Sequence, residues 1–227
     1  MNRTRLDVSD GIAWITLDDG KVNAMSTEML MEIGSRLDEA EAASAVTVIR
    51  GREGIFSAGF DMATLGQGTG PAIQMVRAGA RLIERLLAFP FPVVTACSGH
   101  AYPMGAFLML AADSRFGVEG PYQIGMNETA IGLTVPRFAL ALAHARLTPP
   151  GFARIVTASL FAPEEARRLG YLDHVVPSGE LDARVRGEAE RLCGLDAGSF
   201  TATKARTNEQ VLAALRAGID EELEAAA

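Results

Sequence analysis

Short apolar runs alternate along this chain with longer segments of helical periodicity, and this alternation constrains the fold more than any other feature. Three short segments consist mainly of apolar or β-branched residues, which is typical of buried strands: 12–17, 46–49 and 92–96. After Ser26, a favourable N-cap, apolar residues recur at helical spacing, and residues 72–88 repeat that pattern. The order strand, helix, strand, helix predicts an α/β core built from crossover units.

Further along, the continuous apolar run 104–112 predicts a buried helix, and helical patterns dominate the later part of the chain. The glycine-containing stretches 66–71 and 98–99 predict a mobile surface loop and a turn. The later segments comprise five helical patterns and one strand, at 138–146, 151–159, 163–169, 181–192, 202–225 and 172–176. We therefore expect an α/β core over residues 1–180 and a C-terminal helical region over residues 181–227.

Composition excludes several classes of protein. The 227 residues are 48% hydrophobic and 22% charged, as in a globular protein with one main core. The net charge of −7 lacks the basic footprint of a nucleic-acid-binding protein. Cys97 and Cys193 form no CxxC pair, the first residues contain no apolar signal-peptide region, and proline and glycine interrupt the most apolar stretch, 86–112. We therefore expect a cytoplasmic protein that binds neither nucleic acid nor a membrane.

The sequence lacks the common nucleotide-binding and nucleophile motifs. It contains no G-x-G-x-x-G, no G-x-x-x-x-G-K-[ST] and no G-x-S-x-G. His100, His144 and His174 are scattered singly, whereas zinc clusters need close pairs of ligands. We therefore expect no metal site, and we interpret the three histidines as surface or hydrogen-bonded structural residues.

Two segments are suited to chemistry by backbone groups. F-S-A-G-F-D at residues 56–61 follows a predicted strand, and S-G-H-A-Y-P-M-G-A-F at residues 98–107 leads from a strand into a helix. Glycine and small residues let a ligand approach the backbone closely, and a helix N-terminus adds unpaired N–H groups. Two N–H donors that converge from these segments would form an oxyanion hole. From the residues alone, the alternative is a pair of ordinary tight turns.

Four motifs, in order, resemble those of the crotonase (enoyl-CoA hydratase/isomerase) superfamily. F-S-A-G-F-D-M at residues 56–62 resembles the family motif F-x-A-G-x-D-[LIM], and V-N-A at residues 22–24 resembles an early family loop. S-G-H-A at residues 98–101 resembles the second oxyanion segment, and G-Y-L-D-H-V-V at residues 170–176 resembles a family strand. The resemblance spans about residues 6–210 and implies an α/β fold with a crotonase-like ββα spiral core.

The resemblance also implies a substrate and a set of binding residues. Family members bind acyl-CoA thioesters and pass through an enolate-like state, so coenzyme A is part of the substrate and no separate cofactor is implied. By position, the backbone N–H groups of Phe60 and Met104 are the oxyanion donors, and Asp61 fixes its own loop. The residues matching positions that line the coenzyme A and substrate crevice are Val22, Ala24, Ala58, Met62, Gly105 and Phe107.

The acid/base residues of the family decide the reaction. Hydratases use two glutamates, and the first would fall at position 107, which here is Phe107. The second falls at Glu128, in I-G-M-N-E-T-A-I-G-L at residues 124–133, a run that resembles Δ3,Δ2-enoyl-CoA isomerases, as does V-P-R-F at residues 135–138. The resemblance therefore implies an isomerase in which Glu128 alone moves the proton, with a pKa raised by an apolar pocket.

Three alternatives to this interpretation stay open. Glu128 could be a loop cap or a surface carboxylate with no role in catalysis. The chain could instead be an enoyl-CoA hydratase, which is a lyase. It could also be a catalytically silent homologue that binds acyl-CoA without converting it.

The resemblance further implies a homotrimer or a dimer of trimers. Family chains usually continue with another helix and a basic tail, whereas this sequence ends at Ala227. The phosphates of coenzyme A need basic partners. Lys21 and Lys204 are the candidates, and the alternative for each is a solvated surface lysine.

Overall fold

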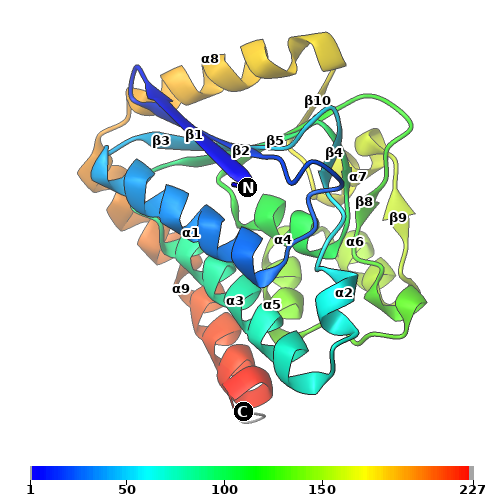
Figure 1. Cartoon of the computed structure of the whole chain (residues 1–227). Helices are drawn as coiled ribbons and strands as arrows, with labels where there is room; N and C mark the ends of the chain where they lie inside the picture. The colour runs from blue at the N-terminus through cyan, green and yellow to red at the C-terminus, as the bar shows by residue number, and fades with distance from the viewer. Residues whose placement is uncertain (1, 225–227) are drawn as a thin grey trace.

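The computed structural model describes residues 2–224, which form two β-sheets. The larger sheet has the strand order β1-β2-β3-β5-β7-β10 (Figure 1). Its strands are β1 (Thr4–Ser9), β2 (Ile12–Leu17), β3 (Val46–Arg50), β5 (Val93–Cys97), β7 (Ser114–Val118) and β10 (His174–Val176). The first two strands pair in an antiparallel hairpin, and all other neighbours are parallel.

The smaller sheet consists of four short strands in the order β4-β6-β8-β9. They are β4 (Gly54–Ser57), β6 (Gly99–Ala101), β8 (Ile124–Gly125) and β9 (Leu160–Phe161). The first three strands pair in parallel, and β9 runs antiparallel to β8. The carboxyl ends of β4, β6 and β8 therefore lie at one edge of this sheet.

The chain repeats one unit, in which it adds a strand to each sheet and then forms a helix. β3 and β4 precede α3 (Thr69–Ala88), β5 and β6 precede α4 (Pro103–Ala111), and β7 and β8 precede α5 (Arg137–Arg146). The short helix α2 (Met62–Leu65) lies between β4 and α3. This repeat is the ββα spiral expected from the sequence, and the predicted α/β fold class is confirmed.

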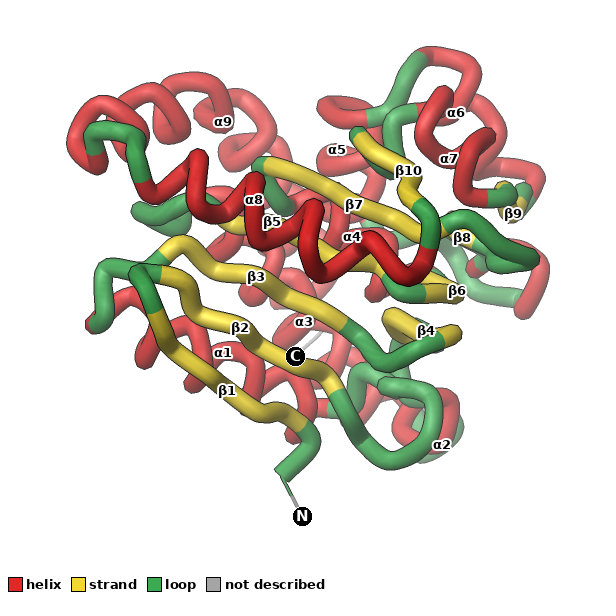
Figure 2. Tube along the Cα trace, turned by 90° about the horizontal axis from the view of Figure 1, so that it is seen from above, coloured by secondary structure: helices red, strands yellow, loops and turns green. Residues whose placement is uncertain are grey.

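Helices cover both faces of the larger sheet (Figures 1 and 2). One face carries α1 (Thr27–Ala42), α3, α4, α5 and α9 (Ala197–Ile219), and every residue of α4 is buried there. The other face carries α8 (Leu181–Cys193), which packs its apolar side on the strands. The remaining helical elements are α6 (Pro149–Ala153), α7 (Pro163–Leu169), the 3₁₀ turns Glu128–Ile131, Arg154–Thr157 and Ser178–Glu180, and a π-helical turn, Asp220–Glu224.

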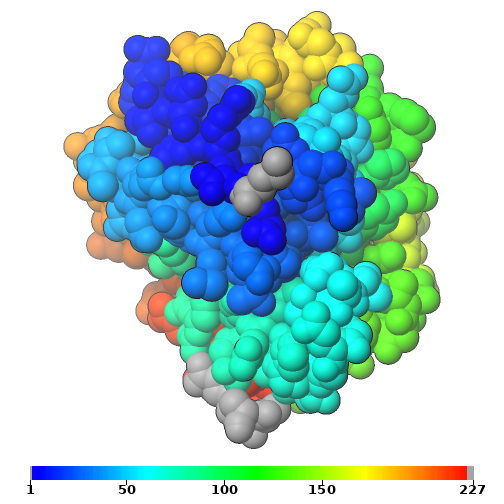
Figure 3. Space-filling view, in the orientation of Figure 1, coloured from blue at the N-terminus to red at the C-terminus, as the bar shows by residue number. Residues whose placement is uncertain are grey.

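The start of α1 follows from its sequence. The Ser26 side chain accepts a hydrogen bond from the Met29 N–H at 3.3 Å, as a favourable N-cap does. The predicted apolar positions Leu30, Ile33 and Leu37 are all buried beneath the larger sheet. Together with the β1–β2 hairpin, α1 supplies the blue surface at the centre of Figure 3.

Two glycine-containing stretches differ from prediction. The loop expected at residues 66–71 is shorter, because α3 already begins at Thr69. Pro71 fits the first turn of that helix, where a missing N–H costs no hydrogen bond. At the turn expected at residues 98–99, Ser98 alone separates β5 from β6, which already begins at Gly99 in the second sheet.

The later segments also differ in their boundaries. The helix expected at residues 151–159 is divided into α6 and a 3₁₀ turn, and the strand expected at residues 172–176 begins at His174. The last helix begins at Ala197, before the apolar periodicity becomes visible, because the Asp196 side chain caps it. No helix within residues 2–224 is long and apolar enough to cross a bilayer.

The helical region expected over residues 181–227 consists, where the structure describes it, of α8, α9 and the π-helical turn, and residues 225–227 lie outside the described part. Lys204 of α9 is not the solvated lysine that the sequence suggested. Its side chain is only 5% exposed, and its Nζ lies 2.6 Å from Oδ2 of Asp113, at the end of α4. This buried ion pair ties α9 to the core and leaves Lys204 unavailable to a phosphate.

The close contact between β4 and β6 predicts that a substitution at Gly99 destabilises the fold, whereas the same substitution at an uncrowded glycine does not. A Cβ on Gly99 would lie 1.9 Å from the carbonyl carbon of Gly54, whereas a Cβ on Gly34, in α1, would meet no atom within 4 Å. We expect Gly99→Ala to lower the free energy of unfolding by about 3 kcal/mol through overpacking. The control Gly34→Ala should raise it by up to about 1 kcal/mol through helix propensity. Urea unfolding measures both, and a Gly99→Ala variant as stable as the wild type would contradict this close approach.

Candidate active site

Two chain segments leave β4 and β6 side by side. These strands pair in parallel as far as Ser57 and Ala101, and the Tyr102 N–H then donates to the Ser57 carbonyl at 2.9 Å. Beyond this point glycine permits backbone contact: a Cβ on Gly59 would lie 3.4 Å from the Pro103 nitrogen. Gly59 also has a φ of 89°, which favours glycine. The segments after the two strands are therefore held at backbone distance from each other.

The V-N-A loop braces the first of these segments. The Ala58 N–H donates to the Val22 carbonyl at 3.0 Å, and the Met25 N–H donates to the Gly59 carbonyl at 2.8 Å. The fully buried Asn23 side chain donates from Nδ2 to the carbonyls of Leu17 and Phe56. These bonds fix the backbone from Phe56 through Gly59, so the next residue, Phe60, starts from a defined position.

The two backbone N–H groups predicted as oxyanion donors are free in the structure. Within residues 2–224, neither the Phe60 N–H nor the Met104 N–H has an acceptor. Met104 lies in the first turn of α4, where helix geometry supplies no partner. The Phe60 ring and the Met104 sulfur both face Gly79 of α3, where an added Cβ would come within 2.8 Å and 3.1 Å of them. Such unpaired donors can bind a negatively charged oxygen.

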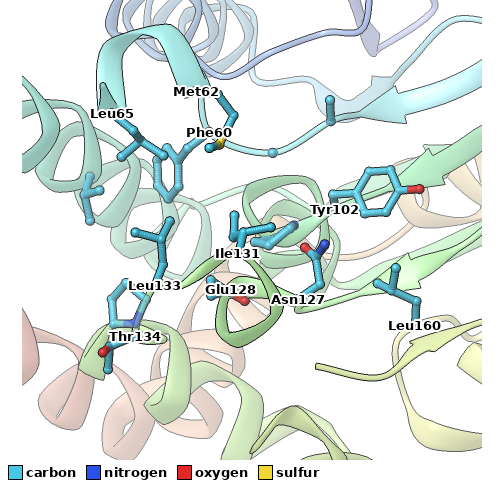
Figure 4. Close-up of a pocket in the computed structure, with 15 residues that line it drawn as sticks. Phe60, Met62, Leu65, Tyr102, Asn127, Glu128, Ile131, Leu133, Thr134 and Leu160 are labelled. Atoms are coloured by element: carbon cyan, nitrogen blue, oxygen red, sulfur yellow. The ribbon is translucent and has the colours of Figure 1, made fainter. Parts of the chain in front are cut away.

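A largely apolar cavity of about 530 Å³ opens next to these segments (Figure 4). In Figure 4, Phe60, Met62 and Leu65 lie across the cavity from Glu128. Its lining residues are Ala58, Gly59, Phe60, Met62, Leu65, Val76, Tyr102, Pro103, Asn127, Glu128, Ile131, Leu133, Thr134, Pro136 and Leu160. Among them, Glu128 carries the one carboxylate.

Glu128 is buried without a hydrogen-bond partner. It begins the 3₁₀ turn that follows β8, it is 5% exposed, and neither carboxylate oxygen has a partner within the described residues. Burial disfavours the charged form and raises the pKa of Glu128 to about 7. The pKa of the Tyr171 hydroxyl is also raised, mainly by burial and further by the charge of Glu128. A carboxylate with these properties can take up and return a proton near neutral pH.

The cavity brings together some of the residues predicted from the sequence. Ala58, Phe60, Met62 and Glu128 line it, and Glu128 is therefore neither a loop cap nor a surface carboxylate. Val22 and Ala24 lie in the loop that braces its wall. Three further predicted residues, Met104, Gly105 and Phe107, belong to α4, and their side chains are buried and do not line the cavity. Met104 directly follows Pro103, which does line it.

Phe107 packs into the core and not into the cavity wall. Its ring meets that of Phe138 edge-to-face, with centroids 5.7 Å apart. Asp61 fixes its loop, as expected, by accepting hydrogen bonds from Thr64 and capping α2. The bond from the Thr64 hydroxyl holds the pKa of Asp61 below its usual value.

Most of the apolar lining was missed by prediction from the sequence. It comes from three separate segments, around Leu65 and Val76, around Ile131 and Leu133, and at Leu160. Ile131 and Leu133 are 47% and 38% exposed instead of joining the core, and this exposure becomes visible only in the structure. Within the described residues, no group of three or more His, Cys, Asp or Glu side chains is placed to hold a metal ion.

Comparisons with known protein families and with solved structures point to the same family. The sequence profile of the family described as Enoyl-CoA hydratase/isomerase matches residues 7–226. A crystal structure of an enoyl-CoA hydratase/isomerase family protein from Pseudomonas syringae is 37% identical, with a TM-score of 0.96 over 98% of this chain and 97% of that one.

Two further relatives bear on the reaction. A Mycobacterium tuberculosis protein, described in one crystal structure as an enoyl-CoA isomerase and in another as a probable enoyl-CoA hydratase, is 38% identical. The isomerase structure has a TM-score of 0.92 over 96% of both chains. A glyoxysomal fatty acid β-oxidation multifunctional protein of Brassica napus is 32% identical over 76% of this chain. The matched region is only 25% of the length of that relative.

The raised pKa of Glu128 predicts a pH dependence of stability. Between about pH 4.5 and pH 7, the folded chain keeps a proton on Glu128 that the unfolded chain releases. The contribution of Glu128 to the free energy of unfolding is therefore fully present below pH 4.5 and falls as the pH rises to 7. We expect Glu128→Gln to gain stability relative to the wild type over this range, by up to about 3 kcal/mol.

Urea unfolding at a series of pH values measures this difference. Glu209→Gln, which removes an exposed carboxylate from α9, is the matched control. A constant difference between Glu128→Gln and the wild type from pH 4.5 to pH 8 would show that Glu128 is not buried as described.

Proposed function

The chain belongs to the enoyl-CoA hydratase/isomerase family, and we propose that within it the chain shifts a Δ3 double bond of an acyl-CoA thioester to Δ2. One observation carries this proposal. A single buried carboxylate, Glu128, lines an apolar cavity next to two free backbone N–H groups. Migration of a double bond needs one group that moves a proton and one site that stabilises the intermediate charge.

In the proposed reaction, the two N–H groups activate the substrate. The thioester oxygen accepts hydrogen bonds from the N–H of Phe60 and the N–H of Met104, which form the oxyanion hole. Negative charge grows on that oxygen when the proton at C2 leaves. Because these donors are strongest toward an anion, they stabilise the dienolate more than the substrate and lower the barrier.

Glu128 then carries the proton from one carbon to the other. Its carboxylate takes the proton from C2 and becomes a neutral acid, and the C2–H electron pair enters the dienolate. The same acid returns the proton to C4, which leaves a double bond between C2 and C3 and restores the carboxylate. The proton count and the charge of the enzyme are unchanged, and no water is consumed.

The surroundings of Glu128 support a proton shuttle more than the addition of water. Hydration in this family uses two glutamates, and the position of the first is occupied here by Phe107, buried against Phe138. Among the described residues that line the cavity, no second carboxylate is available to activate water. The apolar walls also favour the exclusion of water from the dienolate.

This arrangement suggests which residues contact the substrate. We propose that Ala58 and Met62, which line the cavity beside Phe60, contact the acyl-CoA directly. Val22 and Ala24 lie in the neighbouring loop and flank the coenzyme A portion, and Val22 is 49% exposed there. Gly105 and Phe107 act from behind the lining, by setting the position of α4.

Removal of the acid/base group tests the mechanism directly. We expect Glu128→Gln to lower kcat for a 3-enoyl-CoA by about 10²- to 10⁴-fold, the usual contribution of a positioned general base. The amide has nearly the same shape, so binding of the substrate should persist, as calorimetry can show. Glu209→Gln is again the control and should keep full activity.

Unchanged turnover in Glu128→Gln would exclude Glu128 as the acid/base. Assay of the wild type with a 2-enoyl-CoA and with a 3-enoyl-CoA separates the alternatives. Hydration as fast as isomerisation would favour a hydratase. Binding of both thioesters without turnover would favour a catalytically silent acyl-CoA-binding protein.

A one-carboxylate shuttle also predicts transfer of an isotope within the substrate. With 3-enoyl-CoA deuterated at C2, we expect part of the deuterium to appear at C4 of the product, because Glu128 is only 5% exposed and exchanges slowly with water during one turnover. Mass spectrometry or NMR of the product measures the retained fraction. Product incubated with enzyme gives the correction for later exchange, and complete loss of label in the first turnovers would contradict a closed shuttle.

A further inference from the structure

His100 lies between the two halves of the site described above, although neither its motif nor the cavity lining assigns it a role. It is the middle residue of β6, with β4 on one side and β8 on the other. β4 and β6 lead to Phe60 and Met104, and β8 leads to Glu128. The side chain of His100 is therefore placed where the donor segments meet the segment that carries the acid/base.

The pairing between β6 and β8 is short. Its register consists of one pair, Ala101 with Ile124, and the Ala101 N–H donates to the Gln123 carbonyl at 3.0 Å. A ladder of this length fixes the direction of the following residues weakly. β9 pairs with β8 on its other side, at Ile124 with Phe161 and Gly125 with Leu160, so only contacts on the β6 side can set the distance from β8 to the Met104 segment directly.

His100 supplies such a contact on the β8 side. Its Nδ1 accepts a hydrogen bond from the Gln123 N–H at 3.1 Å, directly before β8 begins. Because Nδ1 accepts, the proton of the neutral ring is on Nε2. The bond extends the short β6–β8 pairing by one residue, through a side chain instead of the backbone.

The same ring contacts the segment that carries the second donor. It stacks on Tyr102, with centroids 5.8 Å apart and ring planes 6° apart, and Tyr122 meets it edge-on at 5.4 Å. Tyr102 lines the cavity, directly precedes Pro103 and Met104, and donates its hydroxyl to Gln123 Oε1 at 3.2 Å. In Figure 4, Tyr102 and Asn127 lie on the same side of the cavity.

We propose that His100 is a positioning residue, which sets the placement of the Glu128 carboxylate relative to the N–H of Met104 through its bond to the Gln123 N–H. The inference rests on the proposed function for its catalytic readout. A shift of about 1 Å between reacting groups is enough to change a rate by up to about 100-fold. The loss of this bond should therefore reduce kcat and leave the binding of the coenzyme A portion largely unchanged.

Two variants separate the hydrogen bond from the ring stacking. His100→Phe keeps the ring on Tyr102 and loses the acceptor, whereas His100→Asn keeps an acceptor oxygen near the place of Nδ1 and loses the ring. We expect His100→Phe to lower kcat about 10-fold with KM changed less than about 3-fold, and His100→Asn to keep kcat within about 3-fold. The control is Gln123→Leu, which keeps the Gln123 N–H and removes the Gln123 Oε1 partner of the Tyr102 hydroxyl, whose other partner is His100 Nδ1 at 3.5 Å.

A second readout does not depend on the reaction. NMR titration of ¹³C-labelled Glu128 reports whether its carboxyl group has moved toward water, and we expect a lower pKa in His100→Phe but not in His100→Asn. Thermal unfolding of each variant identifies a general loss of structure. If the wild type converts no 3-enoyl-CoA, the proposed function fails, and the titration alone still decides the role of His100.

Several outcomes would overturn the proposal. If His100→Phe has the same kcat and the same Glu128 titration curve as the wild type, the hydrogen bond does not position Glu128. Equal losses in His100→Phe and His100→Asn would assign the effect to packing in general. A rise in KM without a fall in kcat would place His100 in substrate binding instead.

Discussion

The site depends on the backbone contact between β4 and β6. Gly99 lies so close to Gly54 that no side chain fits between them, and Gly105 similarly faces Ser57. Any larger residue would separate the strands, and with them the segments that carry the N–H groups of Phe60 and Met104. Two donors from distant parts of the sequence are thus aligned because glycine lets the backbones of the two strands approach closely enough to pair.

This rigid frame carries a group that weakens it. Glu128 is buried with no hydrogen-bond partner in the described part of the chain, and such a carboxylate is costly to the folded state when it is charged. The surrounding core offsets that cost, since α4 is buried along its whole length and five helices share one apolar cluster with it. Among the described lining residues, Glu128 alone has buried side-chain oxygens without a hydrogen-bond partner, which is the pattern expected of a functional site.

Much of this architecture could be predicted from the sequence, and the remainder could not for definable reasons. Strong periodicity located α1 and α3, and the buried strands β2, β3 and β5 were clear. The strands β6, β8 and β9 contain two or three residues each, too few to show an alternating pattern. Lys204 was misjudged because its partner Asp113 is 91 residues away, and the cavity wall draws on equally distant segments.

Phe107, which stands where hydratases have their first glutamate, contacts the V-P-R-F segment that resembles the isomerases. Phe107 of α4 and Phe138 of α5 form an edge-to-face pair with both rings fully buried. A glutamate at position 107 would lose this packing and would bury a carboxylate against the ring of Phe138. The packing of α4 on α5 therefore favours an apolar residue at position 107.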